Sequence, residues 1–421
     1  MKKFNAKKTY VFTFIMTIIG AIIGAGFASG KEVASFFGQF GFWVFPFLLL
    51  VAGLFFFCFY LFSKLGKAIK PQSISDLTTA MFGKAGTVVD FVFIISAFIT
   101  LSSMLAGCDS IGKIVFQENY NFCYLSILTA LIVTIIVSVG LKYIFKTTDF
   151  ILPIMMVVLL VIVVVFFATS KPQSISSDSV NFNVFSLMLY SFLYVSMNTF
   201  YNIFIISKTS QYLDKKHTTM SSLLTSGILF VLIGVILLSI FHGGDIILKS
   251  EMPMLQIASG LGQGFSVVYS VILWLAIFTT ICTCAYTIVE WLNTFLKNKF
   301  VCSVIVLTLA FIFSRFGFAT IVDIFYPIEG IFGTIFIAYS AIFYFKNKKN
   351  FDKISAQNDS LSSDDLALLS KKTADASDEV KTEISEQNQV KSLKIEKKNG
   401  KVFVTKKYKN GAVEKSVNKK N

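Results

Sequence analysis

The chain has 421 residues, of which 55% are hydrophobic and only 15% charged, and its formal net charge is +14. A mean hydropathy of +0.71 excludes an ordinary soluble globular protein. Enzyme activity is not expected, because the six cysteines, two histidines and other polar residues form no metal, nucleophile–base or phosphate-cradling motif.

The apolar residues fall into ten long blocks. A hydrocarbon core needs roughly 20 apolar residues per helix, and uninterrupted runs without alternation favour helices over a β-barrel. We therefore predict an all-α polytopic membrane protein with ten transmembrane helices. The blocks cover residues 10–40, 42–63, 87–112, 122–140, 147–169, 183–206, 217–242, 263–295, 300–316 and 319–345.

Lysines gather before span 1 and in the loops after even-numbered spans, and few lie in the odd-numbered loops. The positive-inside rule then places both termini in the cytoplasm, with residues 1–9 as the N-terminal segment. The net charge reflects this bias and a basic tail, so it implies no nucleic-acid partner. No cleavable signal peptide is evident, and the predicted location is the cell membrane.

The ten spans divide into two similar halves, about 10–169 and 183–345. Spans 1, 2, 3 and 5 begin about 175 residues before spans 6, 7, 8 and 10. Because five is odd, the second half enters the membrane from the opposite side, which is an inverted repeat typical of secondary transporters. Coincidental spacing is the alternative.

The first span carries the stretch GAIIGAGFASGKE at residues 20–32, with Gly20, Gly24, Gly26 and Gly30. As one helix, residues 10–40 would be about 46 Å long, too long for one upright span. The glycines weaken the helix, and unwound backbone at depth is tolerated where it lines a cavity. We predict a broken helix here; close helix packing through small residues is the alternative.

Ser29 and Glu32 have the spacing of a capping box, S-x-x-E, which would start the second half-helix. In that interpretation Glu32 reaches back to the backbone of Ser29. The alternative is that Glu32 contacts a substrate amine or a coupling cation. The half-helix N-terminus would also suit a substrate carboxylate.

Three more acids fall within or near spans, where ionisable groups are costly and often functional. Glu329 lies in the middle of span 10, after Pro327, and is a candidate to carry a coupling proton or cation. Glu290 and Asp109 lie nearer to span ends, where placement at the interface is the simpler interpretation.

Residues 346–421 form a polar, lysine-rich tail. Its first part has the composition of a flexible linker. The pairs Asn399-Gly400 and Asn410-Gly411 separate stretches of alternating β-branched residues, which predicts a small β-meander over 391–417. Disorder is the alternative, and the lysines could also rest on anionic lipid.

The stretch IIGAGFASGKEVASFFGQFG, residues 22–41, resembles the YkvI-type bacterial membrane proteins. These are a branch of the amino acid–polyamine–organocation superfamily, which includes LeuT-fold transporters and branched-chain amino acid:cation symporters. The resemblance covers about residues 10–345. It implies a LeuT-like fold with helices 1 and 6 discontinuous, in a bacterial cell membrane.

The resemblance implies a substrate site between the two broken helices. In span 6 the matching stretch is YVSMNT, residues 194–199, which departs from the pattern because it has no glycine. Hydrogen bonding between helices is the alternative role for its polar residues. The implied substrate-binding residues are Gly24, Ala25, Gly26, Ser29, Glu32, Tyr194, Ser196 and Asn198.

Sodium-coupled relatives bind Na⁺ with carbonyls of span 1 and with a carbonyl and two hydroxyls of span 8. The matching residues here are Gly20, Ile23, Ala276, Thr279 and Thr280. A hard cation prefers such oxygen ligands. Alternatively, the two threonines donate back to their own helix.

Many relatives also close their outer side with a basic residue after the span 1 break and an acid early in span 10. Lys31 and Asp323 are the matching pair, and residues 251–262 resemble an outer lid.

The predicted function is secondary active symport of an amino acid or similar small zwitterion by alternating access. The predicted partners are this solute, the lipid bilayer and a coupling ion, Na⁺ or H⁺, with no cofactor. A non-transporting nutrient receptor on the same fold is the main alternative, and a channel is the other.

Overall fold

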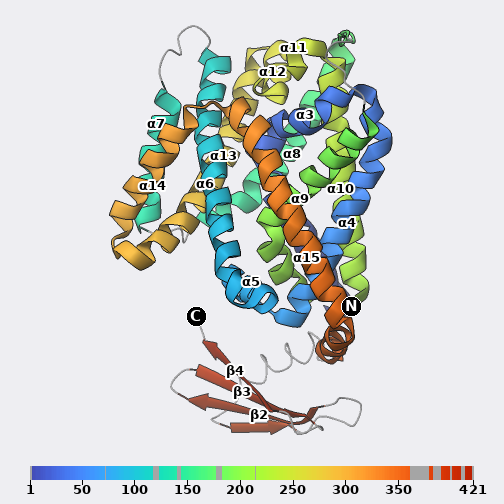
Figure 1. Cartoon of the computed structure of the whole chain (residues 1–421), viewed down its shortest axis with the longest axis vertical. Coiled ribbons are helices and arrows are strands. Elements are labelled where there is room, and N and C mark those ends of the chain that lie inside the picture. Colours follow the sequence, from blue (N-terminus) through green and yellow to red (C-terminus); the bar gives the residue numbers. More distant parts are fainter. Residues whose placement is uncertain are drawn as a thin grey trace.

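The computed structural model describes residues 2–71, 73–116, 123–139, 144–176, 183–213, 215–360, 379–382, 390–398, 401–408 and 413–419. Most of the described chain is a bundle of long helices (Figure 1). The first-half helices are α1 Lys2–Ile22, α2 Ala25–Ala28, α3 Lys31–Phe37, α4 Val44–Ile69, α5 Ile74–Phe82, α6 Gly86–Phe116, α7 Tyr124–Val139 and α8 Ile144–Thr169. The second-half helices are α9 Val184–Thr209, α10 Lys215–His242, α11 Gly244–Leu248, α12 Pro253–Leu261, α13 Gln263–Leu296, α14 Lys299–Ser314 and α15 Phe318–Ser360.

Every predicted span overlaps one of these helices. Within the described residues, six helical stretches are long and apolar enough to cross a membrane, and four apolar helices are shorter. The six are Lys31–Ile69, Ile74–Phe116, Val184–Thr209, His217–His242, Gln263–Leu296 and Phe318–Lys348. The chain is thus a multi-pass membrane protein, and the count of ten spans stays a prediction.

The predicted break in span 1 is confirmed. The long helix α1 ends at Ile22, the single turn α2 follows, and α3 begins at Lys31 after a second interruption. Gly30 has a φ of 78°, a left-handed conformation that an L side chain rarely adopts. The glycine-rich stretch therefore gives the chain the bend that separates α2 from α3.

The predicted break in span 6 is wrong. Every residue of α9 is helical, and no glycine lies within it. The Asn198 side chain donates to the Tyr194 carbonyl (3.1 Å), and the Asn202 side chain donates to the Asn198 carbonyl (2.8 Å). The side chains of Asn198 and Asn202 thus bond to carbonyls of an intact helix.

Glycines let α9 lie very close to its two neighbours. A Cβ on Gly66 of α4 would be 2.1 Å from the Ser207 carbonyl oxygen, and one on Gly333 of α15 would be 2.6 Å from the Ser196 carbonyl oxygen. Such backbone contact is what small residues permit in membrane helices. The position of α9 between α4 and α15 is therefore tightly defined.

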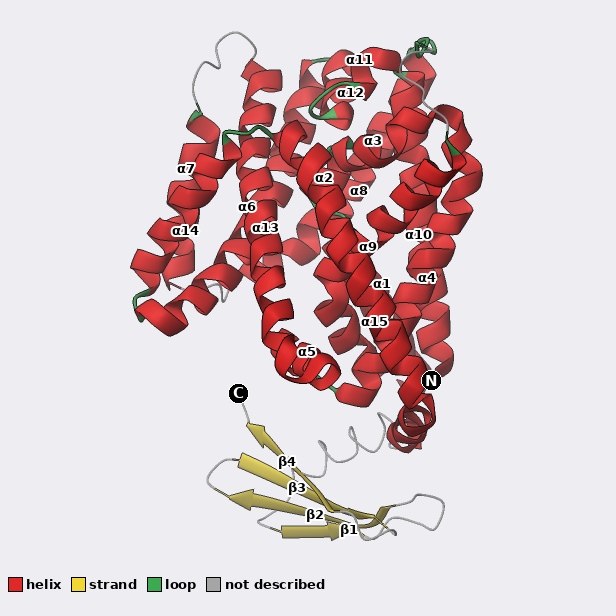
Figure 2. Cartoon of the chain, viewed as in Figure 1, coloured by secondary structure: helices red, strands yellow, loops and turns green. Residues whose placement is uncertain are grey.

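The tail contains an antiparallel sheet of four strands in the order β1-β2-β3-β4 (Figure 2). The strands are β1 Glu379–Thr382, β2 Val390–Lys398, β3 Lys401–Tyr408 and β4 Val413–Lys419. Ile395 of β2 pairs with Val404 of β3, which pairs in turn with Ser416 of β4. Strands β2 to β4 correspond to the meander expected over 391–417, and β1 adds a strand before it. The two Asn-Gly pairs lie outside the described residues.

Candidate functional site

The carbonyls freed where span 1 is interrupted accept hydrogen bonds from a nearby side chain and from residues of α12 and α13. Ser29 donates through its hydroxyl to the Gly26 carbonyl (2.9 Å). Tyr269 of α13 donates to the Ala28 carbonyl (2.5 Å), and the Met254 amide of α12 donates to the Ser29 carbonyl (2.9 Å). Because unsatisfied backbone is costly in a membrane, these bonds stabilise an interruption that the glycines permit.

Glu32 does not form the predicted capping box. No side chain caps α3, and the Ser29 hydroxyl bonds to Gly26 and accepts from the Lys31 amide instead. The bend at Gly30 turns the Glu32 side chain towards α9, where Asn198 donates to its Oε1 (2.9 Å). Glu32 is 5% exposed, so a carboxyl group lies buried between the broken helix and α9.

The Glu32 carboxyl also lies directly against Gly26. A Cβ at position 26 would be 2.7 Å from Glu32 Oε2 and 3.7 Å from the ring of Tyr326 on α15. A side chain at position 26 would therefore displace the Glu32 carboxyl from its present place at the interruption. By contrast, a Cβ on Gly24 would meet nothing within 4 Å, so the backbone there borders open space.

A second buried acid, Glu329, lies along α15 away from its ends, and its exposure is 1%. Tyr201 of α9 donates a short hydrogen bond to its Oε2, and Thr100 of α6 donates to the Tyr201 hydroxyl oxygen (2.9 Å). Among the described residues, Glu329 Oε1 has no hydrogen-bond partner. The cluster joins three helices around one incompletely satisfied carboxyl.

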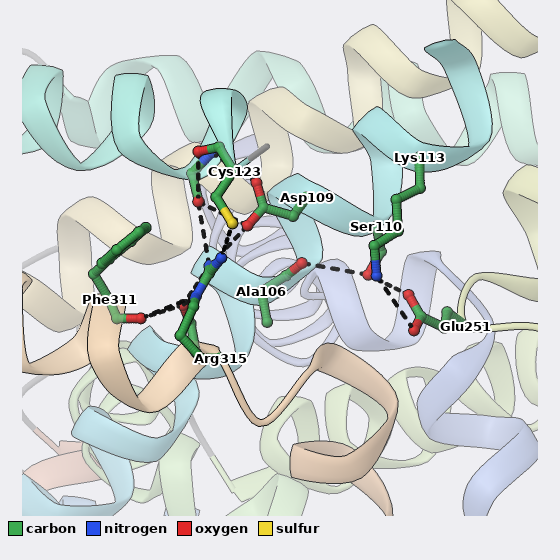
Figure 3. Close-up of polar contacts among 10 residues, drawn as sticks. Ala106, Asp109, Ser110, Lys113, Cys123, Glu251, Phe311 and Arg315 are labelled. Carbon is green, nitrogen blue, oxygen red and sulfur yellow. Dashed lines mark hydrogen bonds and ion pairs between the residues drawn. The ribbon is translucent and has the colours of Figure 1, made fainter. Parts of the chain in front are cut away.

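The other two acids singled out from the sequence are held in ion pairs. Arg315, which follows α14, lies 2.7 Å from Asp109 of α6, and Asp109 also accepts from the Ser126 amide and hydroxyl (Figure 3). Glu290 of α13 pairs with Lys299 of α14. Both acids thus have a cationic partner, whereas the acids at Glu32 and Glu329 bond only to neutral donors in the described structure.

Lys31 and Asp323 form the pair expected from the sequence, with 3.0 Å between Lys31 Nζ and Asp323 Oδ2. The Ser35 hydroxyl also donates to Asp323. The pair joins α3 to α15, and α3 lies near α11 and α12, at the opposite end of the bundle from α5 (Figure 1). The contact is in the right place to hold that end closed; its role as a gate stays a prediction.

Replacing Lys31 with alanine is expected to open the α12 end more often. The Asp323 side chain is 45% exposed, so the pair contributes about 1 kcal/mol or less. A cysteine placed at Gly24 in a cysteine-free background should then react with a polar thiol reagent up to about fivefold faster. Exchanging the two charges should restore the slow rate, and Lys299→Ala, at the pair with Glu290 between α13 and α14, should leave it unchanged. An unchanged rate in Lys31→Ala would contradict the gate.

The structure brings together only part of the implied substrate set. Glu32, Gly26 and Asn198 meet directly, with Ser29 bonded to Gly26. Tyr194 is fully buried, packs edge-on against Phe36 and Phe37, and has a hydroxyl without a partner among the described residues. Ser196 instead accepts from Thr334 on α15 (3.0 Å). Ala25 begins α2, and only its backbone is described.

The threonines of the implied Na⁺ site bond as their alternative interpretation predicts. Thr279 and Thr280 both donate to the Ala276 carbonyl, over 2.9 and 3.0 Å. Gly20 lies in the last turn of α1, and Ile23 directly follows it. Each hydroxyl oxygen keeps its lone pairs, so the Na⁺ site stays a prediction.

Sequence reasoning did not identify Tyr201 and Tyr269 as parts of the site. Tyr201 follows Asn198 by three residues on a helix, a spacing that places both on one face. This spacing would have indicated that Tyr201 belongs to the site if span 6 had been predicted as one unbroken helix. Tyr269 has no comparable signal, because its contact with Ala28 joins residues 241 apart in the sequence.

Comparison with known proteins supports the resemblance. No family model matches the chain. The uncharacterized membrane protein YkvI of Bacillus subtilis (strain 168) is 23% identical over 319 residues, which covers 74% of this chain and 90% of that protein. The resemblance to YkvI-type proteins is therefore confirmed.

Two solved transporter structures share the fold. MhsT in complex with L-phenylalanine has a TM-score of 0.57 at 13% identity, covering 77% of this chain and 87% of MhsT. Mhp1 in an inward-facing conformation has a TM-score of 0.61 at 12% identity, covering 81% of this chain and 77% of Mhp1. The chain thus has the LeuT fold, and at these identities the comparison establishes the fold alone.

Proposed function

We propose that this YkvI-like, LeuT-fold membrane protein is a cation-coupled symporter for an amino acid or a similar small solute that carries an amine. It would work by alternating access in a bacterial cell membrane, with both termini in the cytoplasm. The coupling ion is Na⁺ or H⁺. Fold alone does not determine function, so the proposal depends on the chemistry at the interruption of span 1.

One observation carries the proposal: a buried carboxyl, Glu32, lies at the interruption, and among the described residues its one hydrogen-bond donor is the Asn198 amide. An uncompensated buried carboxylate is costly, so it favours a cationic guest. The ammonium group of an amino acid provides the matching charge.

The experiment is uptake of a labelled amino acid mixture into proteoliposomes, under an inward Na⁺ gradient and separately under an inward H⁺ gradient. Saturable uptake driven by either gradient, with exchange of internal for external solute, is the expected result. Exchange also excludes a channel. No uptake under either gradient, by purified protein that still binds a solute, would contradict symport and favour the nutrient receptor.

The same assay distinguishes the two coupling ions. If Na⁺ binds at the predicted site, the double variant Thr279→Ala and Thr280→Ala should reduce Na⁺-driven uptake by at least about tenfold, because two of the few oxygen ligands are lost. Thr283→Ala is the matched control, since Thr283 donates to the Thr279 carbonyl in the same way one turn further along α13. Unchanged Na⁺-driven uptake in the double variant would exclude this site.

A further inference from the structure

We propose that Glu329 is the site of the coupling proton, distinct from the solute site at Glu32. The proposal deepens the proposed symport by naming its coupling ion. It depends on the geometry of the Glu329 cluster, in which a carboxyl from α15 accepts from Tyr201 of α9, and the Tyr201 hydroxyl accepts in turn from Thr100 of α6.

The Glu329 carboxyl is only partly satisfied by hydrogen bonds in the described structure. Glu329 is 1% exposed, and Oε1 has no partner among the described residues, whereas Oε2 accepts from Tyr201. A carboxylate buried without a counter-charge is strongly disfavoured. Adding one proton to Oε1 neutralises the group and leaves the Tyr201 hydrogen bond to Oε2 in place.

The oxygens around Glu329 suit a proton better than a metal ion. A metal ion such as Na⁺ needs several oxygen ligands at once. Around Glu329, the Tyr201 hydroxyl already donates to Oε2 and accepts from Thr100, so Oε1 is the only carboxyl oxygen left without a partner in the described structure. The Ser96 side chain and carbonyl of α6 also lie at this cluster. A proton needs only Oε1, whereas a metal ion would have to take oxygens that are already hydrogen-bonded to one another.

The titratable groups near Glu329 provide no positive charge to balance a carboxylate. The titratable groups in electrostatic contact with it are Tyr201, Tyr326, Cys284 and Glu32, which come from α9, α15, α13 and α3. None of these carries positive charge. The buried lysines Lys64 and Lys67 lie in the last two turns of α4, just before α5.

A single helix connects the proton site to the solute site. Asn198 and Tyr201 lie three residues apart on the unbroken α9, so their side chains project from one face. Asn198 donates to Glu32 and Tyr201 donates to Glu329. A movement of α9 would therefore change the environment of both carboxyls together, which is what coupling of two sites requires.

The transport test uses Glu329→Gln, which replaces the acid by a neutral group of the same shape. In proteoliposomes the variant should still exchange internal for external amino acids from the labelled mixture. It should lose proton-driven accumulation, to the level of liposomes without protein, and should produce no solute-induced proton influx on a pH-sensitive dye. Glu290→Gln, at the surface ion pair with Lys299, should keep both activities. Accumulation under an H⁺ gradient by Glu329→Gln would overturn the proposal.

A second measurement needs no solute and does not depend on transport. Dicyclohexylcarbodiimide reacts with protonated carboxyls in apolar surroundings, and mass spectrometry locates the adduct. We expect modification at Glu329 that declines as the pH rises and is absent in Glu329→Gln. A folded protein that is not modified at Glu329 at any pH would overturn the proton site. Modification without any uptake would instead contradict symport and leave the proton site intact.

Discussion

Glu32→Gln is expected to weaken binding of amine-bearing solutes by about 30-fold or more, because the variant removes a buried charge that the ammonium would pair with. The glutamine keeps the shape of the side chain and can still contact Asn198, which now donates to the carboxyl over 2.9 Å. Binding to the purified protein by calorimetry is the direct measurement. Transport of the same solutes should fall in parallel.

A series of related ligands makes this test specific for charge. L-phenylalanine and 2-phenylethylamine carry an ammonium group, whereas 3-phenylpropionate carries only a carboxylate on a similar body. Only the two amines should bind to the unaltered protein with an affinity that depends on Glu32. The matched control is Glu290→Gln, because Glu290 is paired with Lys299 at a partly exposed site. Equal affinity of Glu32→Gln and the unaltered protein for both amines would contradict the assignment.

The interruption of span 1 could be predicted because its cause is local. Glycines at 24, 26 and 30 weaken a helix wherever they occur, and the structure ends α1 at Ile22 and bends at Gly30. The Lys31–Asp323 contact was also predicted, but from family resemblance and not from the residues alone. Its presence at 3.0 Å shows that this part of the resemblance extends to side chains.

The incorrect predictions have different physical causes. Ser29 and Glu32 have capping-box spacing, but the left-handed backbone at Gly30 directs Glu32 to α9 and a different partner. Asn198 was expected at a helix break, yet it bonds one turn back and across to Glu32. At Glu32, a contact with Asn198, 166 residues away, replaced the local interaction that the spacing favoured. In span 6 the break was implied by the resemblance alone, and a stretch without glycine keeps its helix.

Gly66→Ala is expected to destabilise the protein by about 3 kcal/mol, since overpacking at a rigid contact forces helices apart. The added Cβ would be 2.1 Å from the Ser207 carbonyl oxygen and 2.5 Å from Ser207 Cα, and backbone cannot rotate away as a side chain can. The helices α4 and α9 would therefore have to separate. The measurement is thermal unfolding of the purified protein in detergent, followed by loss of the monodisperse peak in size-exclusion chromatography.

Gly53→Ala provides a control on the same helix, because a Cβ there would meet nothing within 4 Å. Its stability should be unchanged or slightly higher, by up to about 1 kcal/mol, from the better helix propensity of alanine. Equal melting of the two variants would show that α9 is not held by the contact at Gly66. If Gly66→Ala is unstable as expected, binding at Glu32 should also weaken in the fraction that remains folded. The reason is that α9 carries both Asn198 and Tyr201, so a displaced α9 moves the donors of the solute site and the proton site together.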